Sequence, residues 1–111
     1  MLDMLEVLQM LDRTKNVKIA NIESVDRRFI NLRDNGTYDV LYIIRQIKDV
    51  VTIVHDSGNK DRTGVKIYTL WNRTDEERIR KLLSLGFSVN VVALIMNTDE
   101  EAVLKVIGGT S

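Results

Sequence analysis

Residues 37–49 read TYDVLYIIRQIKD, and whether this stretch forms a helix or a strand decides the fold of the chain. At about 100° per residue, its tyrosines and its arginine fall on one side of a helix, and most of its branched apolar residues fall on the other. Such a partition is typical of an amphipathic helix, and Thr37 is an acceptable N-cap. We therefore predict a helix over 38–49, although isoleucine, valine and tyrosine favour strands. Its outward side would carry Tyr38, Tyr42, Arg45 and Gln46, with Lys48 at the edge.

Read as a strand, the same stretch mixes apolar and polar residues on both faces. A less favoured alternative is a small β-sheet domain in which residues 28–44 form a hairpin, since Asp34-Asn35-Gly36 is a turn signal. The region just before the turn, 21–33, stays ambiguous, because its apolar residues recur at helical spacing while 28–33 alternates like a strand.

Two β-branched and aromatic runs follow, VVTIVH at 50–55 and VKIYTLW at 65–71. The connection DSGNKDRTG between them is polar and contains two glycines. Strands joined in this way form a β-hairpin. This hairpin would present Lys60, Arg62 and Lys66 to a partner, while Trp71 at its end is predicted to anchor the core.

The N-terminal stretch LDMLEVLQMLD at 2–12 is predicted to be an amphipathic helix, with acids near the end that the helix dipole makes positive. VKIA at 17–20 is predicted to be a short strand.

The C-terminal third predicts three helices from local signals. Thr74-Asp75-Glu76-Glu77 is a capping box that opens a helix to about Leu85, and Gly86 stands where a C′ glycine belongs. Ser88 can cap a second helix that Asn97 ends in the left-handed conformation. Thr98-Asp99-Glu100-Glu101 is predicted to be a second capping box, opening a third helix to about Ile107.

Composition limits the classes of function. The 111 residues are 44% hydrophobic and 29% charged, which is typical of a folded globular chain. There is no cysteine and only one histidine, His55, so we expect no disulfide and no metal site. No phosphate-binding glycine loop is present, and His55-Asp56-Ser57 are neighbours in sequence that cannot form a triad together, so we expect no cofactor and no catalysis. No apolar run is long enough to span a membrane, and 1–12 do not resemble a secretory signal, so a cytoplasmic location is expected.

Charge is balanced in total but uneven along the chain. Sixteen basic and sixteen acidic residues cancel. Residues 1–12 carry −3, 13–73 carry +5 and 74–111 carry −2. A surface that binds a polyanion would therefore come from the middle segment.

The order of elements over 2–71 resembles the winged helix-turn-helix family of DNA-binding domains. The resemblance implies that TYDVLYIIRQIKD (37–49) is the recognition helix and that VVTIVHDSGNKDRTGVKIYTLW (50–71) is the wing. The predicted fold class is therefore α+β and mainly helical: a winged helix with a β-hairpin wing over 1–72, followed by a C-terminal three-helix extension over 73–111.

Residues 78–107 also resemble a helix-turn-helix of the kind found in recombinases and many regulators. The helix that would enter DNA begins with Asp99, Glu100 and Glu101, however, and three acids facing phosphates repel them. We expect this unit to serve packing, dimerisation or partner binding instead, with Glu100 and Glu101 as its partner-binding residues.

These observations favour a non-catalytic protein that binds double-stranded DNA, acting as a transcription regulator or a replication accessory factor. Arginine and glutamine can contact base edges, and tyrosine and lysine can contact phosphates. A homodimer is expected, because two copies double the contacts. The alternative is an adaptor that uses the winged-helix shape to dock a protein. The predicted DNA-binding residues are Tyr38, Tyr42, Arg45, Gln46, Lys48, Lys60, Arg62 and Lys66.

Overall fold

A computed structural model of the chain describes residues 4–13, 17–57, 65–71 and 74–108. The chain divides into two compact units, Met1–Asn72 and Arg73–Ser111, which we call the N-terminal unit and the C-terminal unit. Each unit is described here by itself. None of the helices in the described part of the chain is both long and apolar enough to cross a membrane.

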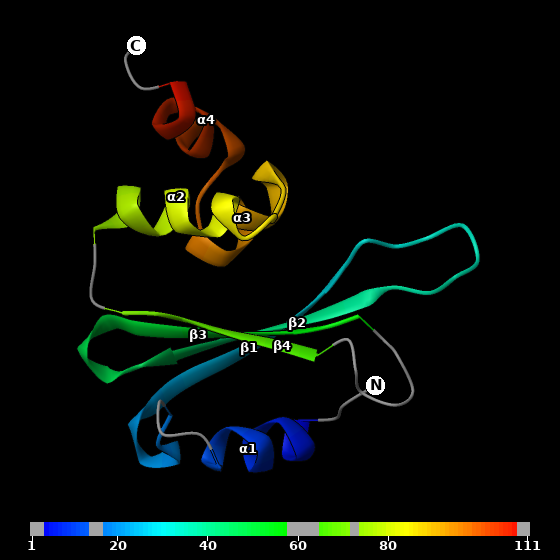
Figure 1. Ribbon diagram of the computed structural model, residues 1–111, viewed down its shortest axis with the longest axis vertical. Coiled ribbons are helices and arrows are strands. Elements are labelled where there is room, and N and C mark those ends of the chain that lie inside the picture. Colours follow the sequence, from blue (N-terminus) through cyan, green and yellow to red (C-terminus); the bar gives the residue numbers. More distant parts are fainter. Residues whose placement is uncertain (1–3, 14–16, 58–64, 72–73, 109–111) are drawn as a thin grey trace. The chain divides into compact units, whose positions relative to one another are not determined.

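The N-terminal unit is a four-stranded antiparallel sheet preceded by one helix (Figure 1). The strands pair in chain order, β1-β2-β3-β4, and each is joined directly to the next. Helix α1 lies on one face of the sheet. The elements are α1 (Met4–Asp12), a 3₁₀ turn η1 (Ile19–Asn21), β1 (Ile22–Ile30), β2 (Asp39–Gln46), a 3₁₀ turn η2 (Ile47–Asp49), β3 (Val50–Asp56) and β4 (Val65–Leu70).

The prediction of a helix over 38–49 is wrong, and with it the mainly helical winged-helix fold. Most of this stretch is β2, an inner strand paired with β1 on one side and β3 on the other. Among the residues described before the β3–β4 hairpin, α1 is the one α-helix, whereas a winged helix requires three. The alternative hairpin is confirmed in kind, because β1 and β2 pair across the turn, with Ile30 opposite Asp39. The short strand predicted at 17–20 is also wrong, because η1 begins at Ile19.

Burial on both faces explains why β2 does not look like a strand in the sequence. Val40, Tyr42 and Ile44 pack in the cluster beneath α1, while Leu41 and Ile43 point to the other face, and all five are fully buried. A strand buried on both sides is continuously apolar and loses the alternation by which strands are recognised.

The core between α1 and the sheet comes from side chains far apart in sequence. Val7 and Leu11 of α1 meet Val40, Tyr42 and Ile44 of β2, with Val17 and Val54 completing the cluster. This confirms the amphipathic helix predicted at 2–12 over the residues that the structure describes.

The C-terminal unit contains three helices, α2 (Asp75–Ser84), α3 (Val89–Met96) and α4 (Glu100–Gly108). Thr74 caps α2, since its Oγ1 accepts a hydrogen bond from the Glu77 amide at 3.2 Å. Gly86, with φ of 99°, follows α2, and Asn97, with φ of 55°, ends α3 in the left-handed conformation. From α2, Arg80 Nη2 donates to the Val106 carbonyl of α4 at 3.0 Å, which ties the first and last helices together.

The cap of α4 differs from the predicted capping box. The Ala102 amide donates to Asp99 Oδ1 at 2.8 Å, so Asp99 is the capping residue and Thr98 is not. The helix consequently begins one residue later than the capping-box pattern implies.

Removing the Asp99 cap should destabilise the C-terminal unit, whereas removing the neighbouring hydroxyl should not. We expect Asp99→Ala to lower the free energy of unfolding by about 1 kcal/mol, because an N-terminal amide of α4 loses its acceptor. Thr98→Ala is the matched control, with an expected change below about 0.5 kcal/mol. Urea unfolding followed by circular dichroism measures both. A larger loss for Thr98→Ala than for Asp99→Ala would contradict this assignment of the cap.

Candidate nucleic-acid interface

Those predicted DNA-binding residues that the structure describes do not form one surface. Alternate residues of a strand point to opposite faces, so Tyr38, Tyr42 and Gln46 face α1 while Arg45 faces the other way. Tyr42 and Gln46 are buried, and Arg45 is half-buried. The ring of the half-buried Tyr38 stands edge-on to Phe29, with 4.9 Å between centroids. The recognition-helix face predicted over 38–49 is therefore not formed, because most of this stretch is a strand.

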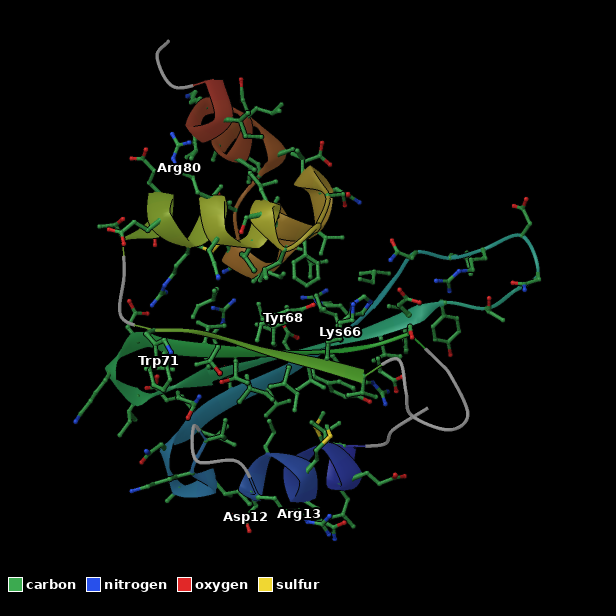
Figure 2. All side chains as sticks on the ribbon, in the orientation of Figure 1. Asp12, Arg13, Lys66, Tyr68, Trp71 and Arg80 are labelled. Atoms are coloured by element: carbon green, nitrogen blue, oxygen red, sulfur yellow. The ribbon has the colours of Figure 1, made fainter. Side chains whose placement is uncertain are left out.

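The basic residues predicted on the β3–β4 hairpin are only partly described. Lys66 is exposed near the start of β4 (Figure 2). Lys60 and Arg62 lie outside the described residues.

Two of the predicted residues do come together, at a pocket beside the β2–β3 turn. This open pocket has a volume of about 300 Å³, at the lower end of the range for small-ligand sites. It belongs wholly to the N-terminal unit and is lined by Asn21, Gln46, Ile47, Lys48, Val50 and Trp71.

The turn that shapes the pocket has an unusual backbone. Lys48 and Asp49 have φ angles of 63° and 62°, a left-handed conformation that is strained for residues other than glycine. Positive φ angles are common in short hairpin connections, where they help to match the twist of the flanking strands. The turn thereby places Lys48, which is exposed, on the rim of the pocket.

A chain of hydrogen bonds fixes the amide at the base of the pocket. Gln46 Nε2 donates to Thr52 Oγ1 at 2.9 Å, and Thr52 Oγ1 lies 3.4 Å from Thr69 Oγ1. Gln46 is only 4% exposed to solvent. Because the amide is held on one side, its remaining donor and acceptor groups have a defined orientation.

Trp71 supplies the aromatic wall, and the prediction that it anchors the core is wrong. It directly follows β4 and remains 48% exposed. Figure 2 shows Trp71 and Lys66 at opposite ends of β4. The only sequence signal for this exposure is that the tryptophan stands where a strand ends and the polar residues Asn72 and Arg73 begin.

The composition of the pocket suits a planar, anionic ligand. An indole face stacks on flat rings, carboxamides hydrogen-bond to ring edges, and an ammonium group pairs with an anion. Of the described residues that line the pocket, none is acidic. The lining residues that the sequence did not indicate as binding residues are Asn21, Ile47, Val50 and Trp71.

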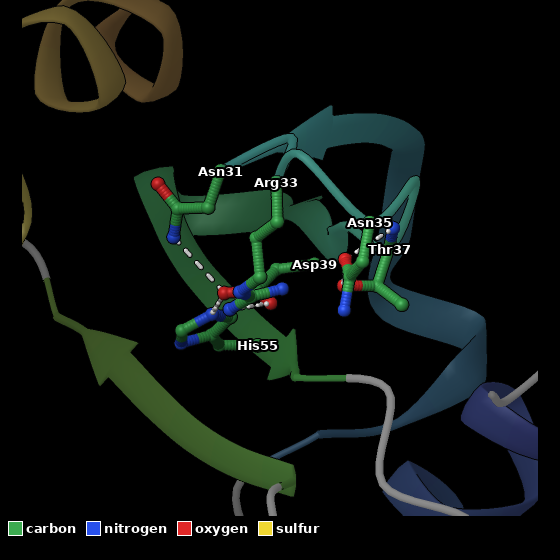
Figure 3. Close-up of polar contacts among 6 residues, drawn as sticks. All are labelled: Asn31, Arg33, Asn35, Thr37, Asp39 and His55. Carbon is green, nitrogen blue, oxygen red and sulfur yellow. Dashed lines mark hydrogen bonds and ion pairs between the residues drawn. The ribbon is translucent and has the colours of Figure 1, made fainter.

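A second polar cluster lies at the other end of β2, around Asp39 (Figure 3). This carboxylate is 2% exposed and accepts from Asn31 Nδ2 at 2.9 Å and from Arg33 Nη2 at 2.8 Å. His55 Nε2 lies 2.9 Å from Asp39 Oδ2, the oxygen that also accepts from Asn31. Burial alone raises the pKa of Asp39, but the hydrogen bonds from Asn31, His55 and Arg33, with the Arg33 charge, together lower it below its ordinary value.

The Asp39 cluster holds the β1–β2 loop in place. Asn31 and Arg33 belong to that loop, and each is bonded to the carboxylate at its base. Within the loop, Asn35 Oδ1 accepts from the Thr37 amide at 3.0 Å, a local turn also drawn in Figure 3. The cluster pairs His55 with Asp39 through the contact between His55 Nε2 and Asp39 Oδ2. The expectation that the chain is not an enzyme stays a prediction.

The acids predicted to bind a protein partner begin α4. Glu100 and Glu101 are exposed, as are Leu104 and Ile107 farther along the same helix. Their role in partner binding stays a prediction. No group of three or more potential ligands that could hold a metal occurs among the residues that the structure describes.

Comparison of the chain with protein-family models, with curated proteins and with solved structures finds no match in any of the three.

Proposed function

We propose that this chain is a non-catalytic nucleic-acid-binding protein that holds an unpaired base in the pocket beside the β2–β3 turn. The observation that carries the proposal is the meeting of Trp71, Lys48, Gln46 and Asn21 around one open pocket. A nucleotide combines the three features for which this pocket is suited, since it has a flat ring, a hydrogen-bonding edge and a phosphate.

The ligand is single-stranded rather than duplex nucleic acid. In a double helix the base faces are covered by neighbouring bases, and reaching one requires that it be flipped out of the stack. A pocket of about 300 Å³ has room for a single base but not for a duplex. Proteins that bind single strands use exposed aromatic side chains on which bases stack, together with basic residues along the backbone.

The aromatic, basic and amide side chains that line the pocket have three different roles in this proposal. The Trp71 indole stacks on the base, an interaction worth about 1–3 kcal/mol. Lys48 pairs with a phosphate, and the amides of Asn21 and Gln46 bond to the edge of the base, as glutamine and asparagine do with adenine. Because the whole chain has no net charge, stacking contributes more than long-range attraction.

The single tryptophan makes the test direct, because any change in tryptophan fluorescence comes from Trp71. Titration with a twelve-nucleotide single strand should quench this fluorescence, and the matching duplex should quench it much less. With a dye-labelled strand, Trp71→Ala should weaken binding by about 5- to 150-fold, the equivalent of about 1–3 kcal/mol. Lys48→Ala should reduce the dependence of log K on log salt by about 0.7.

Lys66→Ala is the matched control, because Lys66 is an exposed lysine at the far end of β4 from Trp71. It should bind as the unaltered protein does. If the strand causes no quenching, or if Lys66→Ala weakens binding as much as Lys48→Ala does, the pocket is not the binding site.

A further inference from the structure

The outer edge of β1 has no partner strand in the described part of the chain. Strand β1 is an end strand of the sheet and spans nine residues, of which only Ile30 is buried. An exposed edge of this length presents a row of backbone donors and acceptors that can pair with another strand. Phe29 is 58% exposed on it.

Side chains on the two faces of β1 differ in character. Val25, Arg27 and Phe29 point to the face that carries α1, since they lie opposite Ile44, Tyr42 and Val40. Asp26 and Arg28 point to the other face. In this chain they form a mutual ion pair of 3.4 Å, with their side chains 51% and 53% exposed.

We propose that two copies of this chain associate by pairing their β1 strands antiparallel, with the two-fold axis at Arg27. In this register Asp26 lies opposite Arg28 of the second copy, and the reciprocal pair forms across the axis. On the other face Val25 lies opposite Phe29 of the second copy, again twice. The edge thus matches itself in charge and in apolar contact, and the two sheets become one continuous sheet of eight strands.

Geometry allows few other registers. Opposite residues of an antiparallel pair lie on the same face, so the axis must pass through a residue rather than between two. An axis at Asp26 or at Arg28 places two like charges together and forms no Asp–Arg pair. An axis at Val25 requires pairing across Glu23, where the register of β1 is already irregular.

The axis at Arg27 also brings two like charges together, but these are partly accommodated within each chain. The Arg27 guanidinium lies over the Phe29 ring, 5.5 Å from its centroid. A cation held against an aromatic face is directed along its own strand rather than at the neighbouring arginine. Two opposite-charge pairs and two apolar pairs therefore outweigh one like-charge pair.

Because the chain contains no cysteine, single cysteines can report the register directly. Arg27→Cys places two sulfur atoms opposite each other across the axis, with Cα atoms about 4.5–5.5 Å apart, a separation that a disulfide accepts. We expect this variant to form a disulfide-linked dimer in air. Ser24→Cys is the matched control, because its two cysteines would be separated by six residues along the strand, about 20 Å. Equal cross-linking of both variants would overturn the proposal.

Charge exchange tests the same register without a cross-link. Asp26→Arg alone and Arg28→Asp alone each place like charges opposite each other, and each should weaken self-association about tenfold or more. Mixing these two variants should restore association as a heterodimer, and the double variant should restore the homodimer. Both positions are about half exposed, so circular dichroism should show an unchanged fold.

Light scattering coupled to size-exclusion chromatography gives the mass of each species. A monomeric unaltered protein at high micromolar concentration would overturn the proposal, as would an Asp26→Arg variant that dimerises normally. Neither result concerns the Trp71 pocket, so the dimer and the proposed function stand or fall separately.

Discussion

Replacement of Tyr42 by alanine should lower the free energy of unfolding of the N-terminal unit by about 3–5 kcal/mol, the loss typical of a large aromatic side chain removed from a core. Tyr42 is fully buried in the cluster beneath α1, where Val7, Leu11 and Val54 are also fully buried. We expect a large decrease in the midpoint of urea unfolding, measured by circular dichroism. A protein of this size has a total stability of about 5–15 kcal/mol, so this loss removes a large share of it.

Two controls separate this effect from a role at the surface. Tyr42→Phe keeps the ring and should cost only about 0.5–1.5 kcal/mol. Tyr38→Ala changes a half-buried tyrosine of the same sequence stretch and should cost less than Tyr42→Ala. If Tyr42→Ala unfolds at the same urea concentration as the unaltered protein, the ring is not in the core and the strand assignment of 39–46 is wrong.

The contrast between the two units shows which parts of the fold the sequence can predict. The helices of the C-terminal unit depend on signals within a few residues, such as the Thr74 cap and the left-handed Asn97. The sheet depends on pairings such as Val25 with Ile44 and Arg27 with Tyr42, which lie many residues apart. Nothing in the stretch 37–49 by itself distinguishes a strand buried on both faces from a helix with one apolar face.

The candidate site was predictable only in part, for a related reason. Gln46 and Lys48 belong to the stretch 37–49, which the sequence pattern indicated as a binding helix, although they lie at the end of β2 and in the turn after it. Asn21 and Trp71 reach the same pocket from η1 and from the end of β4. Their proximity follows from the order of four strands in the sheet, which no local pattern specifies.

The second large loss of stability is expected on replacement of Asp39, whose cluster holds the β1–β2 loop at one end of the sheet. We expect Asp39→Ala to lower the free energy of unfolding by about 2–3 kcal/mol, because Asn31, Arg33 and His55 all lose their acceptor. The loss should fall below that of a fully buried ion pair, since the Arg33 side chain is 45% exposed and water can solvate it. Asp34→Ala is the matched control, an exposed acid of the same loop whose removal should change stability by less than about 0.5 kcal/mol.

Because the pKa of Asp39 is lowered, the contribution of its carboxylate to the free energy of unfolding depends on pH. Because the carboxyl group binds a proton less readily in the folded protein than in the unfolded chain, its contribution is fully present above its ordinary pKa of 3.8. It is lost as the pH falls through the still lower pKa of the folded state. Asp39→Asn keeps the shape but cannot ionise, so the difference in stability between it and the unaltered protein should be large at pH 7 and should shrink below about pH 4. Urea midpoints of both proteins at pH 7 and pH 3 measure this difference, and an equal difference at the two pH values would show that the ionised carboxylate does not stabilise the loop.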